Sequence, residues 1–315
     1  MLFIIKEALA HHEGTVEAKA TGTINTVSGE TLPKGKVVTS FRYDRREFDA
    51  IPDDQLTFLT RLGEDVHAHK REINYRGSVS YGLTNDLTLS LSLPWNSFDQ
   101  FSEATLEDSE IRFIKGDSDG IGDLLLQGKY MFLHTHPDHV SFLGGVKFPT
   151  GDTHEKARGK ERFGTHNQPG SGSVDGRLGF AWSRTYNRRW GIDADIIYEI
   201  RTEGAQDFET GDAVLLDLGL SYAINKNPII INDWLRPRVT LVGEVNAAHQ
   251  ERDTEKDERL QHSGVTIVYL SPGIRVGVNK RTNLWLTGSI PVFQHLSGEQ
   301  AYEKWRMGAG ISISW

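Results

Sequence analysis

The densest group of metal-binding side chains in this sequence is a histidine cluster. His134, His136 and His139 lie in one short stretch, and imidazole nitrogens are ligands that zinc and copper favour. The same stretch holds Pro137-Asp138, which is typical of a tight turn. We favour the turn over a metal site. The pairs His11-His12 and His67/His69 are interpreted in the same way. We therefore expect no metal and no cofactor.

Side chains that could form a hydrolase site occur in one glycine-rich stretch. His166, Ser171, Ser173 and Asp175 lie close together in sequence, but a serine nucleophile needs a base within hydrogen-bonding distance, which spacing alone does not establish. The Gly-x-Ser-x-Gly, His-Glu-x-x-His and P-loop patterns are absent. We predict that the protein is not an enzyme, with a membrane-embedded hydrolase at this stretch as an alternative.

Charged residues recur at alternate positions of apolar segments, which would place them on the inner face of a barrel. The predicted lumen-lining basic residues are Arg42, Arg76, Lys129, Lys147, Arg177, Lys304 and Arg306, and the acidic ones are Asp193, Asp195, Glu199, Asp217 and Glu244. The two sets form a basic wall that faces an acidic wall, with Asp44, Glu72, Arg201 and Arg238 as exceptions. Facing lipid instead would cost about 2–4 kcal/mol for each Arg or Lys. Two hypotheses remain open: a lumen sealed by cross-barrel ion pairs, or a polar pore with a transverse field.

The composition limits how such charges can be arranged. Of 315 residues, 37% are hydrophobic and 25% are charged, and no apolar run reaches the roughly 20 residues of a membrane helix. A net charge of −8 argues against nucleic acid as a partner. Cysteine is absent, which excludes disulfides and thiolate sites. A β-barrel remains compatible, because only alternate residues of its strands face lipid.

A period of two, the strand period, dominates the chain from Gly35 onward. In 303–315, Trp305, Met307, Ala309, Ile311, Ile313 and Trp315 share one face, and Lys304, Arg306, Gly308, Gly310, Ser312 and Ser314 share the other. Such segments run over 35–49, 66–82, 86–99, 121–133, 139–149, 174–187, 189–202, 212–223, 237–249, 263–278, 282–294 and 303–315. Most are long enough for a tilted membrane span of about 9–11 residues.

The connections between these segments alternate in length. Those at 83–85, 134–138, 187–188 and 279–281 are short, whereas those at 50–65, 100–120, 150–173, 203–211 and 250–262 are long. Outer-membrane barrels have this pattern, with periplasmic turns and extracellular loops. The connection Ile224–Arg236 departs from it, because it is long but falls on the short side.

The first 34 residues precede the barrel pattern. Met1–Ile5 is apolar and Ala8-Leu9-Ala10 resembles a signal-peptidase site, but a complete signal needs a basic start and about 7–15 apolar residues. This region is either a signal remnant, with the mature chain starting near His11, or an ordinary chain end. We expect two parts: the N-terminal segment 1–34, as a possible lumen plug or periplasmic extension, and the barrel 35–315.

Five motifs occur in a fixed order along the chain. They are GIGDLLLQGKY at 120–130, GVKFPTGDT at 145–153, PGSGSVD at 169–175, YLSPGIR at 269–275 and SIPVFQHLSGEQ at 289–300. Together they resemble the outer-membrane transporter family named after the meta-pathway of phenol degradation. The resemblance implies an outer-membrane barrel that takes up small, hydrophobic or aromatic compounds, with Lys147–Asp152 and Pro169–Asp175 near a constriction. It brings no catalytic residues.

We therefore predict an all-β fold, a closed antiparallel up-and-down transmembrane barrel of about twelve strands in the bacterial outer membrane. The expected function is passive diffusion of small solutes through a charged lumen. A scaffold barrel with a sealed lumen is the alternative. The expected partners are outer-membrane lipid and a small-molecule solute, and the sequence leaves the oligomeric state open.

Overall fold

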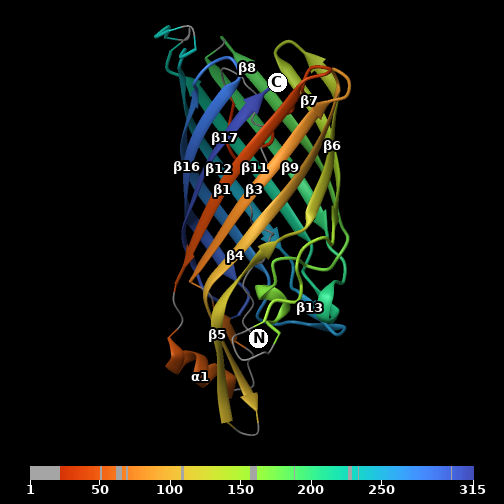
Figure 1. Ribbon diagram of the computed structural model, residues 1–315, viewed down its shortest axis with the longest axis vertical. Coiled ribbons are helices and arrows are strands. Elements are labelled where there is room, and N and C mark those ends of the chain that lie inside the picture. Colours follow the sequence, from red (N-terminus) through yellow and green to blue (C-terminus); the bar gives the residue numbers. More distant parts are fainter. Residues whose placement is uncertain are drawn as a thin grey trace.

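The fold was analysed in a computed structural model that describes residues 22–315 apart from 50–51, 62–65, 69, 108–109, 157–161, 188, 226–228, 233 and 299. Twelve antiparallel strands close into a barrel (Figure 1). They are β1 (Val37–Phe48), β3 (Arg71–Gly82), β4 (Leu87–Glu107), β6 (Leu124–Thr135), β7 (Asp138–Phe148), β8 (Asp175–Tyr186), β9 (Trp190–Ile200), β11 (Ala213–Ala223), β12 (Arg238–Gln250), β15 (Val265–Gly277), β16 (Thr282–Leu296) and β17 (Glu303–Ser314). The predicted barrel is confirmed, and each predicted segment overlaps one of these strands, although β4 runs eight residues beyond its predicted end.

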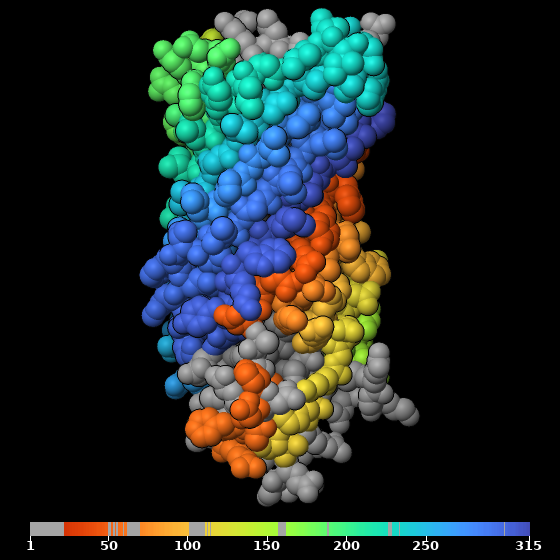
Figure 2. Space-filling view, turned by 90° about the vertical axis from the view of Figure 1, so that its left-hand side faces the viewer, coloured from red at the N-terminus to blue at the C-terminus, as the bar shows by residue number. Residues whose placement is uncertain are grey.

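The first and last barrel strands pair with each other and close the sheet. β1 pairs with β17 from Val38 opposite Ser314 to Phe48 opposite Glu303, and Figure 2 shows the orange-red N-terminal strands lying against the blue C-terminal ones. Closure leaves no open sheet edge, which lipid could not satisfy with hydrogen bonds.

Alternation along each strand inverts the burial pattern of a soluble protein. In β4, Leu89, Leu91 and Leu93 are 38–44% exposed. The intervening Ser90 and Ser92 are buried. Apolar side chains form the outer surface because the hydrocarbon of the membrane covers them, and polar side chains fill the inside.

The two ends of the barrel differ. At one end the strands are joined by short turns, such as the one at 136–137 between β6 and β7; we call this the turn end. The opposite, loop end carries α1 (Asp53–Arg61), β2 (Val66–Ala68), the short helices η1 (Thr165–Asn167) and η2 (Ala205–Asp207), and a small sheet of β10 (Phe208–Glu209), β13 (Thr254–Glu255) and β14 (Glu258–Arg259). In outer-membrane barrels the turn end is periplasmic. None of the described helices is long and apolar enough to cross a membrane.

One long loop predicted from the sequence is instead a hairpin. β4 continues to Glu107 and pairs there with β5 (Glu110–Ile121), so the two strands extend beyond the barrel at the loop end (Figure 1). The segment 100–120 was predicted as a loop because its apolar alternation is broken. Outside the membrane a hairpin needs no apolar face, so alternation does not reveal it.

Candidate functional site: the barrel lumen

Four carboxylates lie side by side on the inner wall near the middle and turn end. They come from neighbouring strands: Asp193 and Asp195 from β9, Asp217 from β11 and Glu244 from β12. The register places Asp195 opposite Asp217, and Gly219 of β11 next to both Asp193 and Glu244. All four side chains are buried. Such charges need partners, because transfer of an unpaired carboxylate out of water is costly.

The partners of Glu244 come from the chain segment before the barrel. We call residues 22–33 the lumen strap. The carboxylate of Glu244 accepts hydrogen bonds from the backbone amides of Ile24, Asn25 and Thr26 at 2.8–3.2 Å, and from the Thr26 hydroxyl at 2.8 Å. Charge-assisted hydrogen bonds of this kind are roughly twice as strong as neutral ones.

The neighbouring acids hold the strap in the same way. Asp193 accepts from the amide and the hydroxyl of Thr23, at 3.2 and 2.9 Å. Asp195 accepts from the amide of Val27 at 2.6 Å. Asp193, Asp195 and Glu244 therefore form a row of acceptors for backbone N–H groups of the strap, whereas Asp217 accepts from the side chain of Asn246 at 2.9 Å.

Beyond Val27 the strap continues across to the other wall. The amide of Gly29 donates to the Ser183 hydroxyl at 2.7 Å, and the Ser141 hydroxyl donates to the Gly29 carbonyl at 2.6 Å. Lys129 donates to the carbonyl of Ser28 at 3.0 Å. The Leu32 amide then donates to the Thr88 hydroxyl of β4 at 2.7 Å. The strap thus reaches from β12 to β4 inside the barrel, at the turn-end side of the lumen.

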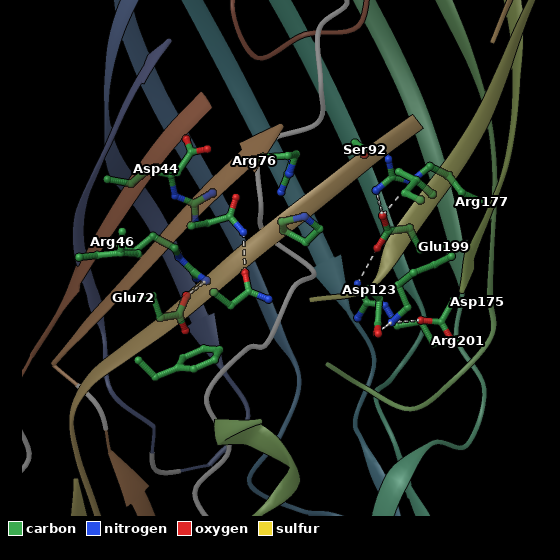
Figure 3. Close-up of a pocket in the computed structure, with 18 of the residues that line it drawn as sticks. Asp44, Arg46, Glu72, Arg76, Ser92, Asp123, Asp175, Arg177, Glu199 and Arg201 are labelled. Carbon is green, nitrogen blue, oxygen red and sulfur yellow. Dashed lines mark hydrogen bonds and ion pairs between the residues drawn. The ribbon is translucent and has the colours of Figure 1, made fainter. Parts of the chain in front are cut away.

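A cavity of about 150 Å³ lies in the loop-end half of the lumen. Paired charges surround it (Figure 3). On one wall, Arg46 pairs with Glu72 and, at 2.8 Å, with Glu303. Arg306 also pairs with Glu303 at 2.8 Å and contacts the ring of Tyr269. One buried carboxylate thus serves two guanidinium groups.

The other wall of the cavity carries a second set of ion pairs. Lys147 lies 2.6 Å from Asp175 and 3.4 Å from Asp123. Glu199 pairs with Arg177 and, at 2.6 Å, with Arg201. The basic lining residues are Arg46, Arg76, Lys147, Arg177, Arg201 and Arg306, and the acidic ones are Asp44, Glu72, Asp123, Asp175 and Glu199. The two signs nearly balance, so the cavity favours neither cations nor anions strongly.

Most of the residues predicted to line the lumen turn inward. Arg76, Lys147, Arg177, Glu199 and Arg306 line the cavity, and Arg42, Lys129, Asp193, Asp195, Asp217 and Glu244 are buried inside the barrel. The predicted segregation into two walls is weaker than expected, because Asp44 pairs with Arg42 and Glu72 with Arg46 on the basic side. Charges pair with near neighbours rather than across the lumen.

The prediction that Lys304 lines the lumen is wrong. The Lys304 side chain is 52% exposed and pairs with Asp49 at 2.8 Å. The register between β1 and β17 shifts at Glu47/Phe48, so Trp305 and Glu303 face consecutive residues of β1. This bulge gives the strand one extra residue and reverses the alternation. Glu303 turns inward in its place.

Sequence reasoning also missed functional residues that the structure brings into the lumen. Arg46 lies two residues after Asp44 and four after Arg42, on the same face of β1. The twofold alternation of β1 could therefore have predicted that Arg46 faces the lumen. Asp123 follows β5, where the twofold pattern is interrupted. Its carboxylate accepts from the amides of Gly151 and Ser171 at 2.9 Å.

The serine and histidine residues considered for hydrolysis do not form a nucleophile and base. The hydroxyl of Ser171 is hydrogen-bonded to Asp123 at 2.6 Å, Lys147 at 2.7 Å and Ser173 at 2.8 Å. Lys147 donates the hydrogen bond to Ser171 and pairs with the carboxylates of Asp123 and Asp175, so it does not accept from the Ser171 hydroxyl as a base would. The ring of His166 packs edge-on against Phe208 at 4.5 Å.

The histidine stretch forms a turn, with residues 136–137 joining β6 to β7. His134 lies 3.9 Å from Asp86 and His139 lies 3.7 Å from Glu30. Among the described residues, no group of three or more His, Asp or Glu side chains could hold a metal ion.

Comparison with known proteins places the chain in a family. Residues 49–290 match the family described as "Putative MetA-pathway of phenol degradation". The chain belongs to this family. No curated protein matches it in sequence. The predicted resemblance is therefore confirmed, and the match covers most of the barrel.

Solved structures show the same fold. An outer membrane channel from Pseudomonas putida F1 aligns with a TM-score of 0.62 at 16% identity, covering 91% of this chain and 97% of that one. A mutant of the monoaromatic hydrocarbon channel TodX aligns with a TM-score of 0.50 at 11% identity, covering 90% of this chain and 91% of that one. At these identities the likeness shows the outer-membrane barrel fold alone.

Proposed function

We propose that this family member is a passive outer-membrane channel for small solutes, closed at its periplasmic end by the lumen strap. One observation carries the proposal: a solute-sized cavity opens inside a membrane-spanning barrel, and a separate chain segment lies between it and the turn end. A strap held by side chains of the wall can leave without unfolding the barrel, because the strands pair without it.

The lining of the cavity supports small aromatic molecules with a hydroxyl or other polar group as solutes. Ile73, Pro94, Phe98 and Leu125 lie among the charged groups. Guanidinium groups stack on aromatic rings and donate hydrogen bonds to polar substituents. The near balance of charge disfavours strong binding of simple ions. The family name, which refers to phenol degradation, is in line with this solute class.

A second candidate is a sealed scaffold barrel, and the strap favours it too. The strap makes hydrogen bonds with several strands, from Glu244 of β12 to Thr88 of β4. If these bonds never open, solutes do not pass. The two functions differ in whether weakening the strap increases conductance.

The test uses Glu244→Gln in planar bilayers. A neutral amide accepts hydrogen bonds more weakly and directs N–H donors at the strap amides, so a loss of about 1.5–3 kcal/mol is expected. That corresponds to roughly tenfold or greater occupancy of the open state. The matched control is Glu258→Gln, because Glu258 is exposed in β14 at the loop end.

The channel proposal expects small conductance steps from the native protein and a higher open probability from Glu244→Gln. The protein-dependent rate of entry, measured as the excess over protein-free vesicles, should be larger for phenol than for glucose. Absence of conductance and of any such excess phenol entry in both the native protein and Glu244→Gln would overturn the channel and leave the scaffold.

A further inference from the structure

The connection between β11 and β12 is an exception among the turns of the periplasmic end. The other connections there are short and polar, for example Asn279–Arg281 between β15 and β16. The connection from Ile224 to Pro237 is longer and carries the apolar run Ile229–Ile231 followed by Trp234. In Figure 1 it is the teal segment that stands outside the ring of strands at the turn end.

Hydrogen bonds hold the backbone of the described residues of this connection. The amide of Ile229 donates to the Pro237 carbonyl at 3.0 Å, and that of Ile231 donates to the Leu235 carbonyl at 3.1 Å. The side chain of Asn232 accepts from the amides of Trp234 and Leu235 at 2.9 and 2.6 Å. The described part is therefore a short hairpin-like extension with a side-chain-stabilised tip. We call residues 229–232, 234 and 235 the apolar tip.

A further hydrogen bond fixes the tip to the barrel. The amide of Arg236 donates to the carbonyl of Val278 at 2.9 Å, which belongs to the next turn of the same end. The base is closed by the amide of Ile224, which donates to the Val239 carbonyl at 2.9 Å. The tip is therefore held away from the wall rather than collapsed onto it.

The tip exposes large apolar side chains. Ile230 is 73% exposed, Trp234 65%, Ile231 59% and Ile229 56%. Removing apolar surface from water stabilises a protein by about 25 cal/mol per Å². Exposure of these four side chains to water is therefore unfavourable. A contiguous exposed apolar group of this kind marks an interaction surface.

Continuity with the lipid-facing surface identifies the partner. Ile224, at the base of the connection, is 50% exposed and continues the outer row of Leu218 and Leu220 on β11. The rings of Trp190 and Tyr222 pack in a tilted arrangement at the same end, with their centroids 4.5 Å apart. Arg189 donates to the Tyr222 hydroxyl at 3.2 Å. Aromatic and basic residues in this combination are typical of the membrane interface.

We propose that the apolar tip inserts into the headgroup–acyl boundary of the periplasmic leaflet and anchors that end of the barrel to phospholipid. Ile230, Ile231 and Trp234 supply the apolar contact, and Arg189 lies at the level of the headgroups. An interfacial segment of this kind buries its apolar side about 5–10 Å deep without crossing the bilayer. This anchoring does not depend on whether the lumen conducts.

The absence of cysteine makes a direct test possible. Ile230→Cys and, separately, Ile231→Cys are labelled with the dye NBD in protein reconstituted into phosphatidylethanolamine–phosphatidylglycerol vesicles. Lys280→Cys is the matched control, because Lys280 is exposed on the neighbouring turn of the same end. Either tip variant suffices if the other fails to fold.

The proposal expects blue-shifted emission at 230 and 231, and quenching by lipid carrying a spin label near the headgroup about twofold stronger than at 280. Aqueous iodide should quench the dye at 280 more than the dye on the tip. Water-like emission with equal iodide quenching at all three positions would overturn the proposal. So would a blue shift that appears only at high protein density, since this would assign the tip to a second copy of the chain.

Discussion

At the scale of single residues, buried carboxylates organise the inside and the loop end of this barrel. Glu244 accepts from three consecutive backbone amides, and Glu303 is shared by Arg46 and Arg306. In each case the cost of burying the charge is offset by several donors, which is the condition under which buried charges are tolerated. These side chains therefore fix neighbouring segments in place.

Asp253 has the same role outside the membrane. Its carboxylate accepts from the Gly211 amide at 2.8 Å and from the side chain of Gln250 at 2.9 Å. Burial raises the pKa of Asp253 to about 6, even though these hydrogen bonds and Arg201 act in the opposite direction. The group is therefore protonated more readily in the folded loop than in the unfolded chain.

We predict that this loop loses stability as the pH rises from about 4 to about 6. The folded-state pKa of Asp253 lies above the unfolded value of 3.8, so its stabilising contribution is complete below that value and lost as the pH passes the folded pKa. The loss amounts to at most about 3 kcal/mol. Asp253→Asn keeps an oxygen acceptor and removes the titration, so its free energy of unfolding should exceed that of the native protein above pH 6.

The measurement is guanidinium unfolding in detergent micelles between pH 4 and pH 8, with Glu258→Gln as an exposed control. Parallel pH profiles for the native protein and Asp253→Asn would contradict the prediction.

Residue positions in the lumen could be predicted from the sequence wherever alternation is unbroken. Asp193, Asp195 and Glu244 are such cases. Lys304 was placed wrongly because a bulge adds one residue to β17. Nothing in the local residue types marks that bulge, since it arises from how β17 pairs with β1, its most distant partner in sequence.

At the scale of elements, the lumen strap is the feature whose position depends most on fit to the wall. A Cβ atom on Gly29 would lie 2.4 Å from the His139 carbonyl oxygen and 2.9 Å from that of Ala181. Both are backbone atoms of barrel strands, which cannot move aside. Only glycine allows the strap to approach β7 and β8 so closely.

We predict that Gly29→Val displaces the strap and increases the protein-dependent part of phenol entry into proteoliposomes, measured as the excess over protein-free vesicles, by about tenfold if the hydrogen bonds of Gly29 with Ser183 and Ser141 are lost. The barrel itself should still form, because its strands pair without the strap. Gly77→Ala is the control, since a Cβ there meets nothing within 4 Å. The prediction fails if Gly29→Val folds and phenol enters at the native rate.

Elements inside the membrane could be predicted because lipid on one side and polar lumen on the other impose strict alternation. The β4–β5 hairpin beyond the barrel is subject to no such pattern and was missed. The strap has no secondary structure of its own, and its partners lie up to 220 residues away in sequence. Its possible plugging role could be suggested from its polar composition, but its contacts could not.

At the scale of the whole molecule, the barrel requires hydrocarbon around its outer surface. Its outer surface carries exposed Leu, Ile, Val and aromatic side chains on every barrel wall, while its interior holds the charges. A soluble protein is stabilised mainly by its apolar core. This barrel is stabilised instead by the pairing of its strands, because every backbone N–H and C=O group in hydrocarbon must have a partner within the protein. The sheet has no edge because β1 and β17 meet.

This arrangement predicts that a charge introduced on the outer face lowers the free energy of unfolding, and that the effect increases with the depth of the charge in the bilayer. Leu93 faces lipid near the middle of the part of β4 that pairs with β3, opposite Gly77, and is 41% exposed. Leu93→Arg should lower the free energy of unfolding by about 2–4 kcal/mol, because the guanidinium must stay near the bilayer midplane. Leu83 is similarly exposed, at 43%, but lies on a periplasmic turn. Leu83→Arg should cost no more than about 1 kcal/mol.

Urea unfolding in phospholipid vesicles measures both values, and Leu93→Ala separates the loss of apolar contact from the effect of charge. A cost confined to Leu93→Arg would assign the destabilisation to charge in the hydrocarbon. Equal costs for Leu93→Arg and Leu83→Arg would mean that the centre of β4 does not lie at the bilayer midplane, and the placement of the whole barrel in the membrane would have to shift.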